Sequence, residues 1–247
     1  MKGSWKMATM SGFTGAVIAL TLVFCARALG LAPFAPVDAD AMHSYLLAHP
    51  DVLVAMTNKL QVQQDDDQDN ARQAAVDKLG LKAFFDPRVA FVTGPAGAKT
   101  TVVEFFDYNC PYCRASVPAM KKFYQAHKNA RFAFIEFPIK GPLSIVAARA
   151  AMAARLQPDK YVAFHFALMN EEGQVDEDSV YAVAKKTGLN VARLKSDMTS
   201  PSVDRAIDAA HTLAKAADID GTPAFIVNGK VREGAMNDDD FAKMTKT

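Results

Sequence analysis

Residues 101–113 read Thr-Val-Val-Glu-Phe-Phe-Asp-Tyr-Asn-Cys-Pro-Tyr-Cys and join a buried strand to the start of a helix. The run 101–106 is rich in β-branched and aromatic residues, which predicts a strand inside a sheet. Pro111 suits the first turn of a helix, where its missing N–H group is not needed. We therefore expect Cys110 to be the exposed cap of that helix and Cys113 to lie one turn inside it.

The position of this Cys-x-x-Cys pair predicts redox chemistry. Unpaired N–H groups at a helix N-terminus stabilise an anion, so the Cys110 thiol should ionise more readily than a free thiol. A stabilised thiolate also favours the dithiol over the disulfide. Cys110 is therefore the expected nucleophile, and Cys113 is the expected resolving thiol.

Two other interpretations of the cysteine pair are structural. A closed zinc site would need two further ligands, and the histidines are scattered along the expected helices. A purely structural disulfide would close so short a loop that chain entropy adds little stability. We therefore predict a redox-active Cys110–Cys113 disulfide with no metal and no other cofactor. The histidines are His43, His49, His127, His165 and His211, of which His165 is expected to be packed structure.

Strand, helix and strand over 101–137 form a βαβ unit, which predicts an α/β fold. The helix is expected over 111–128, kinked or restarted at Pro118. A helical block follows, and a hairpin with an Asn-Gly turn completes the sheet. The expectation is one α/β domain over 87–247 with a helical insertion at about 143–200. Its other expected elements are strand 131–137, helices 147–156, 160–169, 178–187 and 202–217, strands 224–227 and 230–232, and a last helix capped by Asn237.

The first thirty residues have the layout of a secretory signal. Lys2 and Lys6 precede an apolar run over 13–26, and small residues follow it. The run is short for a membrane span, but an anchor that keeps both lysines in the cytoplasm is the alternative. Either function of residues 1–32 delivers the rest of the chain across the membrane, into an oxidising compartment. If the leader is removed with Cys25, the mature chain keeps two cysteines.

Two helices are expected between the leader and the α/β domain. One starts near Asp38, and the next starts at Pro50 and carries an apolar stripe. Such a stripe needs a surface that buries it. We therefore expect residues 37–86 to form a helical region that packs on its own domain or joins copies of the chain. The stripe consists of Leu53, Met56 and Leu60.

The composition excludes several classes of protein. With 247 residues, half of them apolar, the chain can bury a sizeable core, so neither a disordered nor a fibrous protein fits. Its 28 basic residues nearly balance its 27 acidic residues, and a net charge of +1 creates no overall positive field to hold nucleic acid. We therefore expect partners to be recognised by local chemistry.

A second motif, Gly221-Thr222-Pro223, stands directly before an expected strand. Together with the cysteine pair at the strand–helix junction, the helical insertion and the hairpin, it resembles the thioredoxin-fold DsbA family of secreted thiol–disulfide oxidoreductases. The resemblance covers about 95–246, and 103–113 is its most specific stretch. It implies that Pro223 is cis and lies against the cysteines, and that Thr222 pairs its backbone with substrate.

Two further positions complete the candidate site. By the same resemblance, Glu104 falls on a buried acid of the family. A buried carboxylate is costly unless it is paired or changes its pKa, so the resemblance implies proton transfer to or from Cys113. The alternative is a strand residue paired with a nearby lysine. Tyr112 lies between the thiols, where we expect it to be exposed, to tune the pair and to touch client proteins.

Residues 42–53 are similar to the leader helices of ScsC-like proteins, the suppressor-of-copper-sensitivity subfamily, in which this region can build oligomers. That resemblance implies a homotrimer or another homo-oligomer. Several sites on one assembly would raise their effective concentration around a misfolded client. The Pro-Tyr dipeptide and Thr222 also resemble the isomerase members DsbC and DsbG.

The expected function is that of a periplasmic protein disulfide isomerase or reductase. It would act on misfolded or reduced secreted client proteins and be kept reduced by a membrane thiol electron donor similar to DsbD or ScsB. One alternative is a monomeric DsbA-like dithiol oxidase. An alternative of another class is a copper-binding or chaperone protein in which the same thiols hold Cu(I).

Overall fold

The computed structural model describes residues 38–246 and divides the chain into two compact units, 1–63 and 64–247. The expected signal peptide or membrane anchor at 1–32, with Cys25, lies outside the described residues. Between residues 38 and 246, no helix is long and apolar enough to cross a membrane. The sheet and the cysteine pair both belong to the second unit.

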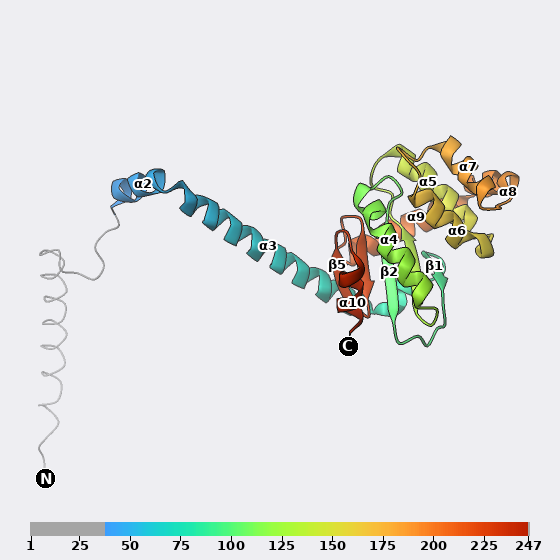
Figure 1. The fold of residues 1–247 in the computed structure, drawn as a ribbon, viewed down its shortest axis with the longest axis horizontal. Coiled ribbons are helices and arrows are strands. Elements are labelled where there is room, and N and C mark those ends of the chain that lie inside the picture. Colours follow the sequence, from blue (N-terminus) through green and yellow to red (C-terminus); the bar gives the residue numbers. More distant parts are fainter. Residues whose placement is uncertain (1–37, 247) are drawn as a thin grey trace, which may run out of the picture. The chain divides into compact units, whose positions relative to one another are not determined.

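A five-stranded sheet forms the centre of the second unit (Figure 1). Its strands are β1 Ala90–Thr93, β2 Thr101–Phe106, β3 Arg131–Glu136, β4 Ala224–Val227 and β5 Lys230–Glu233. They lie in the order β1-β3-β2-β4-β5, with β2 and β3 parallel and the other neighbours antiparallel. Glu104, in the middle of β2, lies between Phe134 of β3 and Phe225 of β4.

Helices surround this sheet and confirm the α/β fold class. They are α4 Pro111–Ala126, α5 Pro142–Ala154, α6 Pro158–Met169, α7 Glu177–Lys186, α8 Val191–Met198, α9 Pro201–Ala216 and α10 Asp238–Thr245. The expected helical block follows β3 and ends before β4, so it is inserted between two halves of the sheet. Asn237 caps α10 as expected, because its side chain accepts a hydrogen bond from the Asp240 N–H group (3.1 Å).

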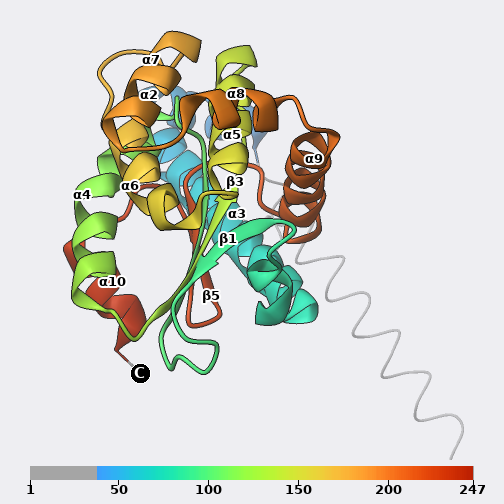
Figure 2. The same ribbon diagram turned by 90° about the vertical axis from the view of Figure 1, so that its right-hand side faces the viewer.

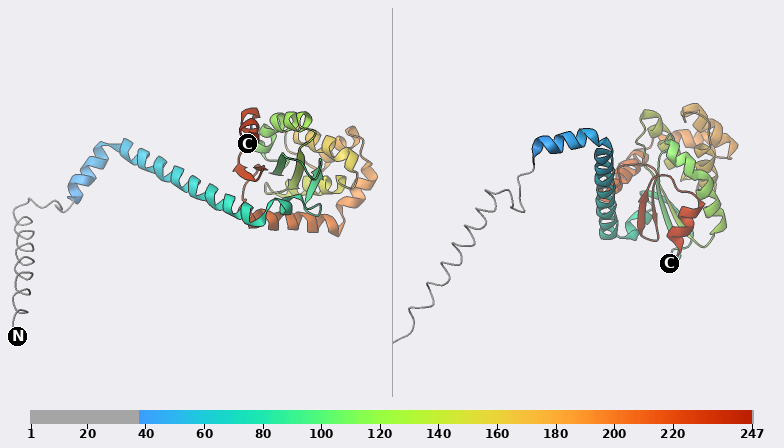
Figure 3. Two further views of the ribbon diagram at one scale, coloured as in Figure 1. Left: turned by 90° about the horizontal axis from the view of Figure 1, so that it is seen from below. Right: turned by 60° about the vertical axis from the view of Figure 1, so that its left-hand side comes forward.

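The two faces of the sheet are covered by different helices (Figures 2 and 3). Side chains that alternate along a strand point to opposite faces. Val102 and Phe106 belong to one core with α4, α6 and α10. Val103 and Phe105 belong to a second core with α9, the 3₁₀ helix Leu81–Phe85 and the end of the preceding helix. Both faces of β2 are therefore buried, as its unbroken apolar run predicts.

The structure differs from the sequence-based expectations at several elements of this unit, among them the 3₁₀ helix Leu81–Phe85, β1 and α4. β1 was not predicted, because it has four residues and is defined by its pairing with β3. Helix α4 runs as one element through Pro118, so no restart occurs there. The Pro118 ring removes one backbone donor, yet the turns on either side are held because Val117 and Met120 are buried in the core.

Two helices precede the sheet, as expected: α2 Ala39–Ala48 and α3 Pro50–Leu79. Asp38 caps α2, because its carboxylate accepts hydrogen bonds from the backbone N–H groups of Asp40 and Ala41 (3.1 and 3.2 Å). None of the residues 38–63 is buried. The second unit begins at Gln64, inside α3, whereas the sequence placed the boundary at 86/87. The reason is that the last turns of α3 bury Arg72 and Val76.

Candidate active site

The end of β2 and the start of α4 place the cysteine pair at the edge of the sheet. Cys110 is the N-cap of α4, with φ −85° and ψ 119°, and Pro111 begins the helix. The Cys110 N–H group donates to the Asp107 carbonyl (3.1 Å), and the Arg114 N–H group donates to the Cys110 carbonyl (3.2 Å). The helix therefore starts immediately after Cys110, as the sequence predicts, and its first N–H groups lie beside the thiol.

Asp107 holds the turn that carries Cys110. Its buried carboxylate accepts hydrogen bonds from the N–H groups of Ile139 and Lys140 (both 2.8 Å) and from the Ser144 hydroxyl (2.7 Å). It also accepts one from the N–H group of Asn109 (2.7 Å). The strand end, the turn and the start of α5 are thereby joined. Sequence reasoning missed Asp107, although an acid directly after a buried strand is a usable signal for such a turn.

Cys110 is buried, with 0% of its surface exposed, which corrects the expectation of an exposed cap. The loop before β4 covers it: the Cys110 Sγ–H group donates to the Thr222 carbonyl (3.1 Å). The Thr222–Pro223 peptide bond is cis, as the family resemblance implied. Tyr112, by contrast, has 67% of its surface exposed, as expected.

The two free thiols have pKa values shifted in opposite directions. Hydrogen bonding with the Cys113 side chain is the main cause that lowers the pKa of Cys110 to about 5, although burial opposes it. The Thr222 side chain and the N–H groups of Cys113 and Tyr112 lower this pKa further. Burial raises the pKa of Cys113 well above its ordinary value, and the neighbouring Cys110 adds to that rise. The pair can therefore hold one thiolate, on Cys110, and one thiol, on Cys113.

Glu104 is a buried acid on β2, beneath the cysteines. Burial raises its pKa to about 8, and its Oε2 atom has no hydrogen-bond partner among residues 38–246. Its charge is the smallest of the contributions that raise the pKa of Cys113, after burial and the neighbouring Cys110. Within the same described residues, no lysine pairs with Glu104, so the alternative of a lysine-paired strand residue is wrong.

The match to a known protein family agrees with this geometry. Residues 101–246 match the family model described as the DSBA-like thioredoxin domain. The chain belongs to the DsbA-like thioredoxin family. That fold implies thiol–disulfide oxidoreductase chemistry in general, and the cysteine pair lies at the strand–helix junction where the family resemblance placed it.

Several solved structures resemble this DsbA-like chain. A thioredoxin-like oxidoreductase from Silicibacter pomeroyi is 39% identical, covers 67% of this chain and 95% of its own, and has a TM-score of 0.62. BcfH from Salmonella enterica Typhimurium is 28% identical, covers 92% and 97%, and has a TM-score of 0.68. The catalytic domain of ScsC from Proteus mirabilis is 25% identical, covers 70% and 96%, and has a TM-score of 0.62. These neighbours support the ScsC-like resemblance.

The curated relatives that the chain matches are much longer proteins. A Na⁺/H⁺ antiporter named NhaA 1 from Salinispora arenicola is 30% identical over 161 residues, which make up 64% of this chain and 24% of that protein. The chain thus spans about a quarter of the length of the curated relatives it matches.

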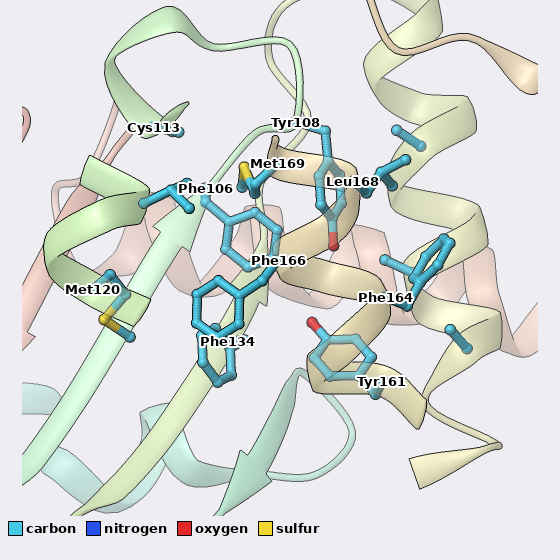
Figure 4. Packing of buried hydrophobic residues seen from close by; sticks show 14 of the residues in the cluster. Phe106, Tyr108, Cys113, Met120, Phe134, Tyr161, Phe164, Phe166, Leu168 and Met169 are labelled. Carbon is cyan, nitrogen blue, oxygen red and sulfur yellow. The ribbon is translucent and has the colours of Figure 1, made fainter. Parts of the chain in front are cut away.

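Below the thiols, four buried polar side chains of the DsbA-like domain contact one another. The Tyr108 and Tyr161 hydroxyls donate to Glu136 Oε1 (3.4 and 3.3 Å), and Figure 4 shows the two hydroxyl groups pointing toward each other. The Tyr108 hydroxyl also lies 3.1 Å from His165 Nδ1. Burial lowers the pKa of His165 to about 3, so this histidine is neutral packed structure, as expected. Glu136 was not singled out from the sequence, because its strand reads as apolar.

Among residues 38–246, no three His, Cys, Asp or Glu side chains gather as a metal site. The residues that the structure brings together at the thiols are Cys110, Pro111, Cys113, Thr222 and Pro223, with Glu104 beneath them and Tyr112 on the surface.

Proposed function

We propose that this chain is a periplasmic thiol–disulfide oxidoreductase that acts mainly as a protein disulfide isomerase or reductase. Cys110 is the nucleophile and Cys113 the resolving thiol. The observation that carries the proposal is the position of Cys110: it is the N-cap residue of α4, and its thiol lies against the Thr222 carbonyl and has a pKa lowered to about 5. Such a thiol is a thiolate at neutral pH.

In the first step, the Cys110 thiolate attacks one sulfur of a client disulfide. The client S–S bond breaks as a Cys110–client disulfide forms, and the other client sulfur leaves as a thiolate. In isomerisation, another client thiolate attacks the mixed disulfide. Cys110 then leaves as a thiolate, so the client gains a different disulfide without net oxidation or reduction.

In reduction, Cys113 resolves the mixed disulfide. Once Glu104 has released its own proton, the Cys113 thiol gives its proton to the Glu104 carboxylate and attacks Cys110 Sγ, so the client sulfur leaves as a thiolate and a Cys110–Cys113 disulfide forms. Two electrons from a membrane thiol donor return this disulfide to the dithiol. The pKa of Glu104, raised to about 8, suits proton exchange near neutral pH.

Client chains are proposed to bind at the surface between Tyr112 and the Thr222–Pro223 segment. The exposed Tyr112 ring offers an apolar contact beside the thiols. The Thr222 backbone offers hydrogen bonds that do not depend on the client sequence. A thiol covered by the Thr222 carbonyl also requires that the client segment displaces this contact as it approaches Cys110.

The isomerase proposal includes self-association through α2 and the first half of α3. This segment exposes nine large apolar side chains, and nothing among residues 38–63 is buried. So many exposed large apolar side chains on two neighbouring helices indicate an interaction site. A second or third copy of the chain is the proposed partner, because identical stripes repeating at helical spacing can pack on one another. The side chains are Met42, Tyr45, Leu46, Leu47, Leu53, Val54, Met56, Leu60 and Val62.

We expect the change of Leu53 and Leu60 to lysine to dissociate the oligomer and to remove isomerase activity. Each buried leucine contributes about 1.5–3 kcal/mol per chain, and the introduced charges repel one another. Reactivation of scrambled ribonuclease should fall by at least about tenfold as the effective concentration of sites is lost. Light scattering measures the mass of the variant in solution. Its separate active sites should still oxidise a reduced peptide.

Asn58→Lys is the control for introducing a lysine, since it adds one positive charge on the same helix but away from the stripe. It should keep both the mass and the reactivation of the parent protein. A parent protein that is monomeric, does not reactivate scrambled ribonuclease and oxidises reduced peptides quickly would contradict the isomerase proposal. That result would support the monomeric dithiol oxidase instead.

The proposed compartment is the periplasm. The leader at 1–32 has the layout of a signal peptide or anchor. The chain is also 28% identical to a structure described as a periplasmic thioredoxin-like protein from Salmonella enterica serovar Typhimurium. An oxidising compartment supplies the client disulfides on which the proposed chemistry depends.

A further inference from the structure

Arg72 is a buried cation on α3, with 2% of its surface exposed. Its Nε atom donates to the Asp218 carbonyl (3.1 Å), Nη1 to Asp69 Oδ1 (2.9 Å), and Nη2 forms an ion pair with Glu233 Oε2 (3.0 Å). Each nitrogen of the guanidinium has a partner, as burial of a charged group requires. Removing the guanidinium from water costs free energy. Its directional hydrogen bonds offset part of this cost and fix the positions of the groups that Arg72 joins.

Two of these partners flank the loop that covers Cys110, residues 218–223. Asp218 opens the loop after α9, with a left-handed φ of 56°. Glu233 lies opposite Ala224 at the end of the hairpin, and its Oε2 atom is 3.8 Å from the position that a Cβ on Gly221 would take. The next residue also contacts the loop, because the Gly234 N–H group donates to the Pro223 carbonyl (2.9 Å).

We propose that Arg72 is a positioning residue for the reactive thiol: it bridges Asp218 and Glu233 and so holds the 218–223 loop with the Thr222 carbonyl against Cys110 Sγ. The contacts run from α3 through Arg72 to Asp218 at the start of the loop and to Glu233 beside it, and from Thr222 to the thiol. The helix that carries the exposed apolar segment therefore also sets the geometry of the thiol. The inference deepens the proposed function and rests on Cys110 being the reactive group.

The neighbouring Gln73 separates this role from simple attachment of α3. Its Nε2 atom donates to the Gly229 carbonyl (2.8 Å), and its Oε1 atom accepts from the Val231 N–H group (3.0 Å). Gln73 thus ties α3 to the β4–β5 hairpin at its turn, and neither of these two hydrogen bonds involves the 218–223 loop. Gln73→Ala weakens the attachment of α3 but leaves the bridge of Arg72 in place.

The experiment measures the pKa of Cys110 in the reduced full-length protein by the ultraviolet absorbance of its thiolate. Arg72→Met and Glu233→Gln should both raise this pKa, by up to about one unit, because each loosens the loop that carries Thr222, whose side-chain hydrogen bond lowers the pKa of Cys110. Gln73→Ala should leave it unchanged. Urea midpoints of the three variants show that each is folded and how much stability it lost.

Arg72→Met removes a positive charge and Glu233→Gln removes a negative one. Comparing them separates an effect of loop position on the Cys110 pKa from a direct electrostatic effect. Loss of the Arg72 cation raises a thiol pKa through charge alone, whereas loss of the Glu233 anion lowers it. A rise in both variants therefore supports positioning. A fall in Glu233→Gln, no change in Arg72→Met, or an equal rise in Gln73→Ala would overturn the inference. Absence of exchange activity in the parent protein would instead contradict the proposed function, because the pKa comparison does not depend on activity.

Discussion

Replacing Cys110 with serine should reduce thiol–disulfide exchange by more than about 1,000-fold, because a serine hydroxyl is neither ionised at neutral pH nor able to form a disulfide. The side chains differ by one atom, so the fold should persist. Exchange is measured as reduction of a disulfide-linked peptide by the reduced protein. Exchange by Cys110→Ser at more than a few per cent of the parent rate would show that Cys113 can act as the nucleophile.

Cys113→Ser is the matched variant, because it removes one thiol and leaves the low-pKa thiol in place. It should still attack a client disulfide but should not resolve the product by reduction. The Cys110–client mixed disulfide should therefore accumulate, and a non-reducing gel or an intact mass shows it. If mixed disulfides accumulate instead in Cys110→Ser, the roles assigned to the two cysteines are reversed.

Replacing Glu104 with leucine should stabilise the reduced protein by about 3 kcal/mol at pH 7. Burial raises the pKa of Glu104 from its ordinary 4.5 to about 8, so at pH 7 the folded protein must hold a proton that the unfolded chain has released. This penalty is absent below pH 4.5, grows as the pH rises and levels off above pH 8. Urea unfolding between pH 4 and pH 9 should show the gain in stability following that curve.

The same variant should be a poorer reductase. Without the Glu104 carboxylate, Cys113 has no buried proton acceptor, so resolution of the mixed disulfide should slow by about 10²–10⁴-fold while the first attack by Cys110 is retained. Glu104→Gln keeps the shape without the ionisation and should show the same slow resolution. A Glu104→Leu protein that is less stable at pH 7, or whose stability difference does not change with pH, would show that Glu104 is ionised in the folded protein.

A large part of the fold was predictable because local signals agreed with one another. The apolar run of β2, the proline after Cys110 and the Asn-Gly turn before β5 each specify one local conformation, and the structure shows all three. Pro111 marks the helix start through its own fixed backbone. The positive φ of 52° at Asn228 is the conformation that its turn requires.

The features that the sequence did not predict depend on contacts between segments that lie far apart in the chain. β1 exists through its pairing with β3, and Cys110 is covered by Thr222, which lies 112 positions further along the chain. The bridge from Arg72 to Asp218 spans 146 positions, and no local pattern distinguishes Arg72 from an exposed helical arginine. Glu104 was predicted in part. The family resemblance indicated a buried acid at this position, whereas the structure was needed to exclude a lysine partner.

At neutral pH, Cys110 is expected to be a thiolate while Cys113 remains a thiol. The most direct measurement follows the ultraviolet absorbance of the thiolate in the reduced protein as a function of pH, with Cys110→Ser as the reference. We expect a single transition near pH 5 that Cys110→Ser lacks. A transition near pH 9, the ordinary value for a cysteine, or one that persists without Cys110 would contradict it.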